Sequence, residues 1–283
     1  MRALSALAVA TLLAACASTS DSTGSADSTP VAATASTAEP EEVGHVFLLH
    51  DSGGSVDRPG PFLADVVRPE VVAIGDRIAA LATVTPTEVA AGYTTAVPAG
   101  TRVRSATTEA GVATVDLSDE FASGGGAFSM SARLAQVVFT ATAGPEWART
   151  MNLLIDGELV STFSSEGIEL SQPLTRETST DVLPLVLVEQ PAAYEAITTT
   201  LSVSGLASVT DHRFRAELLD ADRAPLAALP DIVTDGSGWG EFFVTVTIPE
   251  FEAGTVVILH VWDDSPGDST AVGERYIPLT VAP

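Results

Sequence analysis

Residues 111–121 read GVATVDLSDEF, and this stretch decides how the first half of the chain is interpreted. Its apolar and β-branched part predicts a strand over Gly111–Leu117, and a second strand is predicted over Thr101–Thr107. Glu109-Ala110-Gly111 would join the two strands, because glycine is typical of tight turns.

The rest of residues 43–178 predicts a mixture of helices and strands. The expected elements are a strand over Val43–His50, an extended segment over Val66–Ile74, a helix over Gly75–Thr83, a helix over Ser129–Thr142 and a hairpin of Met151–Asp156 and Glu158–Phe163. In the second helix, apolar residues from Leu134 to Ala141 recur at helical spacing, and the N-cap is expected at Ser129 or Ser131. Asp156-Gly157 is the strongest hairpin signal.

From Asp181 onward the pattern changes to short β segments separated by turns rich in Gly, Pro and Asp. The predicted strands are Leu185–Glu189, Leu201–Leu206, Arg213–Leu219, Pro225–Val233, Glu241–Ile248, Thr255–Trp262 and Tyr276–Val281. Such a series predicts an immunoglobulin-like sandwich. Trp239 or Trp262 could fill its core instead of a cross-sheet disulfide, because the second half of the chain has no cysteine.

The beginning of the chain predicts export and lipid attachment. A basic residue, Arg2, precedes an apolar run and the sequence Leu13-Ala14-Ala15-Cys16, and Cys16 is the only cysteine. This arrangement is that of a signal peptide over residues 1–15, and it resembles the bacterial lipobox, whose cysteine is diacylated. Residues 16–42 are rich in Ser, Thr and Ala, and they predict a disordered tether. The resemblance implies anchoring through Cys16 at the extracytoplasmic face of the cell membrane.

Charge and composition exclude several classes of protein. The net charge is −24, and all 13 basic residues are arginine. An acidic surface repels phosphate backbones, so a nucleic-acid partner is not expected. Without lysine, the chain has no P-loop lysine, no Schiff-base lysine and no Ser-x-x-Lys pair.

Several motifs follow one another in the order found in one known domain. They are Val46-Phe47-Leu48-Leu49, Arg68 before a helix, Val97-Pro98-Ala99-Gly100-Thr101, residues 111–121, Gln136-Val137-Val138-Phe139-Thr140, Asp156-Gly157 and Pro173-Leu174-Thr175-Arg176. This series resembles the GerM domain of bacterial sporulation and spore-germination lipoproteins. The second half is similar to the immunoglobulin-like module that often follows GerM domains, on the segments 201–205, 238–242 and 276–281.

The resemblance implies the fold class and the role. It implies an α+β GerM-like domain over residues 43–178, followed by an all-β immunoglobulin-like sandwich over residues 181–283. It further implies a non-catalytic interaction or assembly module of the cell envelope, with an envelope protein or a second copy as partner. The alternative is a binding module for cell-wall glycan, a small ligand or calcium. No catalytic residue, cofactor or metal ligand is expected.

Three groups of residues invite a chemical interpretation. His50-Asp51-Ser52-Gly53-Gly54 resembles the Asp-Ser-Gly-Gly of trypsin-like peptidases, but a glycine-rich turn is favoured. Calcium ligands could come from Asp220 and Asp222 or from the cluster that begins at Asp263, where solvated turns are favoured. Asp116, Asp119 and Glu120 invite an acid/base role, where capping is favoured, and Trp147 is expected to pack in a core.

Overall fold

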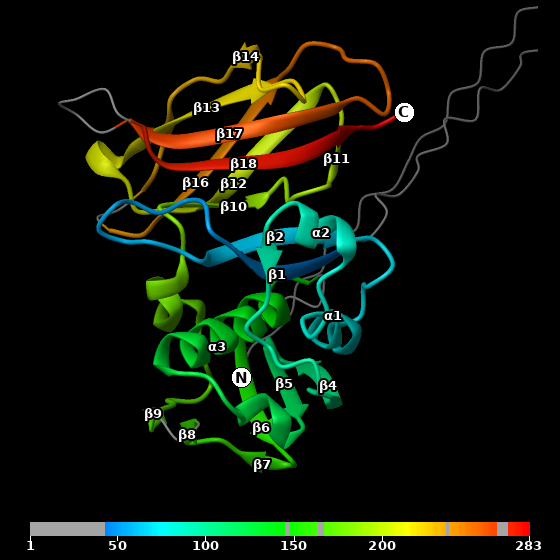
Figure 1. Cartoon of the computed structure of the whole chain (residues 1–283), viewed down its shortest axis with the longest axis vertical. Coiled ribbons are helices and arrows are strands. Elements are labelled where there is room, and N and C mark those ends of the chain that lie inside the picture. The colour runs from blue at the N-terminus through cyan, green and yellow to red at the C-terminus, as the bar shows by residue number, and fades with distance from the viewer. Residues whose placement is uncertain (1–42, 145–147, 164–166, 236–237, 265–270) are drawn as a thin grey trace, which may run out of the picture. The chain divides into compact units, whose positions relative to one another are not determined.

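The computed structural model describes residues 43–283, apart from 145–147, 164–166, 236–237 and 265–270. The predicted signal peptide, Cys16, the tether and Trp147 therefore lie outside the described residues. Residues 41–283 group into one compact unit (Figure 1). Among the helices of the described part, none is long and apolar enough to span a membrane.

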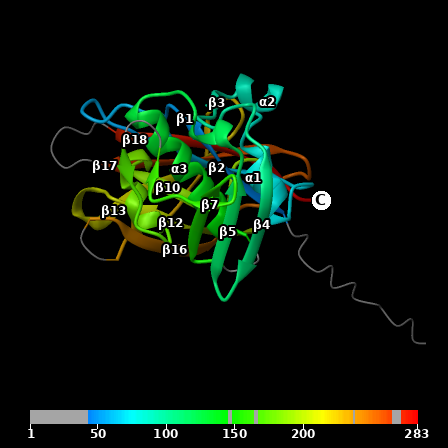
Figure 2. The same cartoon turned by 90° about the horizontal axis from the view of Figure 1, so that it is seen from below.

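The first domain is built on a four-stranded sheet with the order β4-β5-β6-β7. Its strands are β4 (Val103–Glu109), β5 (Val112–Leu117), β6 (Thr150–Ile155) and β7 (Glu158–Leu159). β5 and β6 are parallel, because the 3-10 turn η1 (Asp119–Ala122) and helix α3 (Ala127–Thr142) connect them. Figure 2 shows the antiparallel neighbours β4 and β5 side by side. Alternate residues of β5 are buried, so the predicted strand is confirmed over residues 112–117 as a half-buried strand, and Gly111 belongs to the turn before it.

The two predicted turns of this sheet are confirmed. Ala110 and Gly111 have φ of 50° and 80°, and Asp156 and Gly157 have φ of 49° and 85°. Two successive residues with positive φ are what a tight two-residue hairpin needs, and glycine adopts that conformation without strain.

A second sheet of the first domain has the order β2-β1-β3. Its strands are β1 (Gly44–His50), β2 (Phe62–Arg68) and β3 (Tyr93–Thr94), and helices α1 (Ile74–Ala80) and α2 (Pro86–Ala90) lie between β2 and β3 in the sequence. The predicted strand at 43–50 and helix at 75–83 are confirmed. The extended segment predicted at Val66–Ile74 was placed too late, because β2 pairs along the whole of β1 from Phe62 onward.

Helix α3 completes this second sheet with its polar side chains. β3 pairs only with Leu49 and His50, so no strand of the described residues pairs with the middle of β1 on that side. Thr140 Oγ1 accepts a hydrogen bond from the backbone N–H of Phe47 at 3.0 Å. Gln136 Nε2 donates to the Phe47 carbonyl at 2.9 Å, and Gln136 Oε1 accepts from the Ala96 N–H at 2.8 Å. These side chains therefore satisfy backbone groups that a strand would otherwise pair.

The predicted N-cap of α3 was wrong. The helix begins at Ala127 with Gly126 as N-cap, and no side chain caps it. Ser129 and Ser131 lie inside the helix instead. The preceding glycines Gly124 and Gly125 have φ of 64° and 87°, so they turn the chain into the helix before either serine is reached.

The second domain is a sandwich of two sheets. One has the order β10-β12-β16, and the other has the order β11-β18-β17-β13-β14, with β15 paired to β13. The strands are β10 (Val186–Gln190), β11 (Ala196–Ile197), β12 (Thr200–Ala207), β13 (Arg213–Leu219), β14 (Pro225–Ala228), β15 (Ile232–Val233), β16 (Gly240–Thr247), β17 (Val256–Asp264) and β18 (Ala271–Val281). Each predicted β segment after residue 181 is confirmed, with 225–233 divided between β14 and β15.

Phenylalanines, and neither of the two tryptophans, fill the core of the sandwich. Phe214 of β13 and Phe242 of β16 are buried and meet edge to face across the sandwich, with ring centroids 4.8 Å apart. Trp239 and Trp262 are only partly buried. An edge-to-face pair of phenylalanines fills the space between the sheets and leaves no indole N–H without a partner.

The two domains pack against each other through β2. Ala193, which follows β10, pairs in parallel with Val66, and its N–H donates to the Asp65 carbonyl at 3.0 Å. Buried Arg275 of β18 donates from Nη1 to the Leu63 carbonyl at 2.8 Å. A separate buried cluster combines side chains of both domains: Phe47, Leu49, Leu63, Ala132, Ala135, Phe139, Val182, Leu183 and Leu187.

The remaining described elements are short. They are the strand pair β8 (Thr162–Phe163) and β9 (Ile168–Glu169), the 3-10 segment η2 (Arg176–Val182) that leads into the second domain, and the 3-10 turn η3 (Thr210–His212).

Candidate functional site

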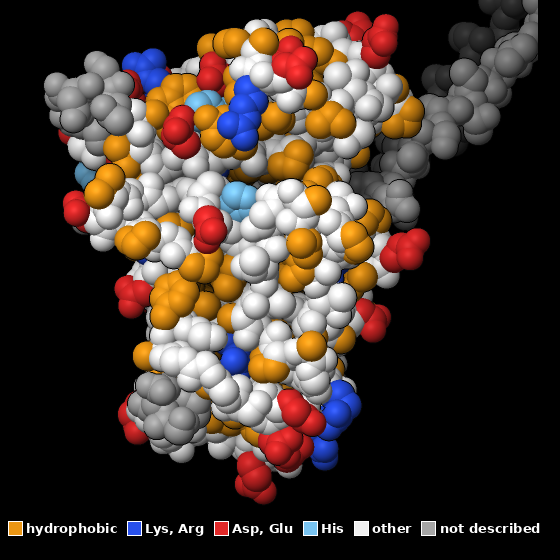
Figure 3. Space-filling view, in the orientation of Figure 1, with side chains coloured by type: hydrophobic (Ala, Val, Ile, Leu, Met, Phe, Trp, Pro, Cys, Tyr) orange, Lys and Arg blue, Asp and Glu red, His pale blue; other side chains and the backbone are white. Residues whose placement is uncertain are grey.

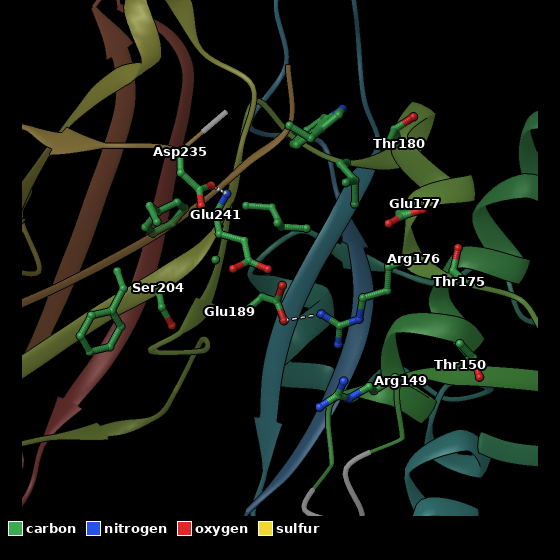
Figure 4. Close-up of a pocket in the computed structure, with 16 residues that line it drawn as sticks. Arg149, Thr150, Thr175, Arg176, Glu177, Thr180, Glu189, Ser204, Asp235 and Glu241 are labelled. Carbon is green, nitrogen blue, oxygen red and sulfur yellow. Dashed lines mark hydrogen bonds and ion pairs between the residues drawn. The ribbon is translucent and has the colours of Figure 1, made fainter. Parts of the chain in front are cut away.

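A cleft of about 1070 Å³ lies where the two domains meet. One wall comes from Arg149 and Thr150 at the start of β6 and from η2, and the other comes from β10, β12 and β16 (Figure 4). In the paired strands β12 and β16, Ser204 lies opposite Phe243, and Leu206 lies opposite Glu241. The cleft is thus open to the outer face of one sheet of the sandwich.

Arg176 holds the two walls together. Its Nη1 pairs with Glu189 Oε2 of β10 at 2.5 Å, its Nε donates to Thr142 Oγ1 at 2.7 Å, and its Nη2 donates to the Phe139 carbonyl at 3.3 Å. The guanidinium also lies over the Phe139 ring, 4.5 Å from its centre. The arginine of the motif at residues 173–176 therefore links the end of α3 to the second domain.

Acidic side chains predominate around the cleft. Glu177, Glu189, Asp235 and Glu241 line it together with Arg149 and Arg176. Asp235 Oδ1 is occupied locally, because it accepts the Glu241 N–H at 2.7 Å. Figure 4 shows the guanidinium groups of Arg149 and Arg176 on the side of the cleft that faces Glu189. The space-filling view also shows acidic side chains scattered over one face of the molecule, with basic side chains in few places (Figure 3).

A smaller pocket of about 330 Å³ shares Arg149, Arg176, Glu189 and Ser204 with the cleft. His45 and Asp65 also line it, and His45 Nδ1 lies 2.7 Å from Asp65 Oδ2.

Burial raises the pKa of the Asp65 carboxyl, although His45 opposes this effect. Burial alone would lower the pKa of His45, but the Asp65 carboxylate more than offsets it, so the His45 pKa is raised.

The structure brings Ser52 and His50 together, yet their geometry is that of a local turn. Ser52 Oγ lies 2.8 Å from His50 Nδ1, and the Ser52 backbone N–H donates to the same nitrogen at 3.1 Å. His50 Nε2 lies 3.0 Å from the Ala91 carbonyl, so the histidine is oriented by a carbonyl and not by a carboxylate. This arrangement satisfies a turn and lacks the carboxylate of a hydrolase triad.

The acidic residues after β5 have structural partners. Asp116 Oδ1 accepts the Gly157 N–H at 3.0 Å, and Asp116 Oδ2 lies 3.3 Å from Arg104 Nε, so Asp116 secures the β6–β7 turn. Hydrogen bonding from the Ser118 hydroxyl, with a contribution from Arg102, lowers the pKa of partly exposed Glu120 to about 2. The predicted capping role is confirmed for Asp116, while no described contact assigns a role to Asp119.

The acidic residues of the second domain also serve its turns. Asp220 Oδ1 accepts the N–H groups of Asp222 and Ala224 at 2.9 and 2.7 Å. Asp263 is buried, and its Oδ2 accepts from the N–H and hydroxyl of Thr210 at 3.0 and 3.1 Å. Within the described residues, no group of three or more His, Asp and Glu side chains could hold a metal ion.

One ion pair of the first domain, between Arg68 and Glu88, was not predicted from the sequence. Arg68 donates from Nε and Nη2 to the two carboxylate oxygens of Glu88 at 2.9 and 2.7 Å, and it also binds the carbonyls of Ala80 and Thr83 at the end of α1. Glu88 completes a capping box with Thr85 at the start of α2. The signal was present as Thr-Pro-x-Glu at residues 85–88, which is typical of a helix start.

The fold and the cleft define a two-domain protein with an α+β domain followed by an immunoglobulin-like sandwich. Residues 53–161 match the Germane family model, described as "Sporulation and spore germination". Residues 185–270 match the Gmad2 model, described as "Immunoglobulin-like domain of bacterial spore germination". The chain therefore carries a Germane domain followed by a spore-germination immunoglobulin-like domain, which confirms the fold class and the family resemblance. The exact domain bounds, 43–178 and 181–283, stay predictions.

Solved structures similar to this chain include domains of one sporulation protein. The first GerMN domain of GerM from Bacillus subtilis is 18% identical, covers 48% of this chain and 98% of its own length, and has a TM-score of 0.40. The tandem GerMN domains of the same protein are 14% identical, cover 72% of this chain and 61% of their own length, and have a TM-score of 0.41. No curated protein matches the sequence.

Proposed function

We propose that this chain is a lipid-anchored, extracytoplasmic protein-interaction or assembly module of the cell envelope, and that it is not an enzyme. The observation that carries this proposal is the tandem of a Germane domain and a spore-germination immunoglobulin-like domain within one compact unit. The described site residues support it, because Ser52, Asp116 and Asp220 all stabilise turns.

The anchor rests on Cys16 and can be tested separately. Cys16→Ser removes the thiol to which the acyl chains would attach, so the variant should leave the membrane fraction after a high-salt wash. Ala17→Ser is the matched control, because it introduces the same side chain one position later and should stay in the membrane. Membrane retention of the Cys16→Ser protein would refute the anchor.

The interaction role predicts contacts at exposed apolar side chains of the second domain. Phe243 on β16 is 71% exposed, which is unusual for a phenylalanine and marks a candidate contact. A photoreactive phenylalanine analogue at position 243 in the membrane-bound chain should give one discrete adduct with an envelope protein or a second copy. The same analogue at Leu159, 61% exposed in the first domain, provides the comparison. Only diffuse adducts at position 243, indistinguishable from those at position 159, would contradict this role.

The cleft supports a second candidate, a binding module for a small ligand or glycan. A concave site with a few convergent polar groups is the usual form of a ligand site. Calcium is disfavoured at Asp263, because Thr210 already occupies one oxygen of its carboxylate. A thermal-shift screen of calcium and cell-wall fragments, repeated with Asp263→Ala, separates these ligands. If calcium raised the melting temperature and Asp263→Ala abolished that rise, calcium would be a ligand of this chain.

A further inference from the structure

The small pocket beside the cleft is lined by Asp65, whose carboxylate has one buried oxygen without a described partner. Asp65 is only 5% exposed, and His45 takes its Oδ2. Its Oδ1 is buried and has no hydrogen-bond partner among the described residues. A buried acceptor without a donor is costly, so a donor that reached this oxygen would be bound favourably.

The charges around the pocket select a positively charged donor. Thr142, Ala143 and Gly144 line it at the C-terminal end of α3, where the helix carries partial negative charge. Arg176, one of the two arginines that line the pocket, is engaged by Glu189 and Thr142. The Asp65 carboxylate and the C-terminal end of α3 therefore both favour a positively charged donor.

Arg149 supplies a positive charge where the small pocket adjoins the cleft. It is exposed and lines both the pocket and the cleft, and no described residue forms an ion pair or hydrogen bond with its guanidinium. An exposed guanidinium without an ion-pair partner among the described residues can bind a carboxylate through two parallel hydrogen bonds.

We propose that the pocket binds the amino terminus of a short peptide, with the ammonium group donating to Asp65 and a peptide carboxylate bound by Arg149. The rest of the peptide lies in the cleft along the outer face of β12 and β16. This binding function does not depend on the proposed anchoring and assembly role, so either proposal can be refuted without the other.

Calorimetry on the full chain in detergent tests the proposal with tri-alanine as the probe. Tri-alanine should bind saturably, whereas N-acetyl-tri-alanine and tri-alanine amide should each bind about 10-fold more weakly or worse, since each loses one charged contact. Arg149→Gln should abolish the preference for the free acid over the amide. Arg213→Gln, which removes an exposed arginine of the second domain, should leave both preferences unchanged.

Asp65→Asn adds the complementary test, and its melting temperature shows whether it folds. In the folded variant, free and acetylated tri-alanine should bind equally. Should this variant fail to fold, the Arg149→Gln comparison decides the proposal on its own. Equal binding of free and acetylated peptide by the unsubstituted chain, no heat of binding up to about 10 mM peptide, or binding of chitotriose alone would overturn it.

Discussion

Gln136 provides the most direct test of how the first domain is held together. Its side chain is fully buried, donates to the Phe47 carbonyl and accepts from the Ala96 N–H. Gln136→Ala leaves both backbone groups without these partners, and water cannot easily replace them at the fully buried Phe47. The substitution should therefore destabilise the chain more than the loss of a typical side chain would.

The magnitude follows from the two lost hydrogen bonds. A buried polar group left unpaired costs about 1–3 kcal/mol, so two such groups, one of them only partly buried, predict a loss of roughly 2–4 kcal/mol. For a chain of this size, each kcal/mol lowers the melting temperature by about 2–4 °C, which gives a decrease of roughly 5–15 °C.

Thermal and urea unfolding followed by circular dichroism measure this loss. Gln190→Ala is the matched control, because Gln190 is exposed and its side chain forms no hydrogen bond with a described residue. Gln136→Glu tests the donor separately: its carboxylate can accept from Ala96 but cannot donate to Phe47. A decrease below about 1 kcal/mol for Gln136→Ala, close to that of the control, would show that the helix does not replace a strand at this edge.

Three further predictions concern the cores and the buried charges. Phe214→Ala should lower the unfolding free energy by about 3–5 kcal/mol in urea titrations, because it empties the centre of the sandwich. Burial raises the pKa of Glu88, but the ion pair with Arg68 more than offsets this effect and holds the pKa below 4.5. The stability that this ion pair contributes is therefore present above pH 4.5 and is lost as the pH falls through the lowered pKa. Melting curves of Arg68→Met should lack that acid-side loss. The raised pKa of His45 contributes stability that is full below pH 6.5 and is lost as the pH rises through the raised value, so His45→Gln should flatten this alkaline decline.

Local signals predicted the elements of the fold well. The hairpins at Ala110-Gly111 and Asp156-Gly157 depend on residues next to each other, and the structure confirms both. The start of α3 could not be predicted, because Ser129 and Ser131 carry the usual capping side chain while the glycines before them redirect the chain. The capping preference of serine and the backbone freedom of glycine compete here, and the sequence alone does not show which of them sets the first residue of the helix.

The cleft could not be predicted, because its residues are far apart in the sequence. Arg149, Arg176, Glu189, Ser204 and Glu241 belong to different elements, and no spacing pattern unites them. The motifs nevertheless marked several of the residues that hold the molecule together. Thr140 binds the backbone of Phe47, and Arg176 binds Glu189, so the motif positions have structural tasks that only the folded chain reveals.

The contacts of Arg176 determine how the domain junction and the cleft depend on each other. Because this arginine binds Glu189 and the end of α3 at once, a ligand that competed for Glu189 would weaken the link between the domains. A ligand that bound only Asp65 and Arg149 would leave that link intact, since Asp65 Oδ1 and the Arg149 guanidinium have no described partners to lose. The proposed peptide is of this second kind, so its binding should raise the melting temperature of the whole unit, whereas a ligand that displaced Glu189 would give a smaller rise or none.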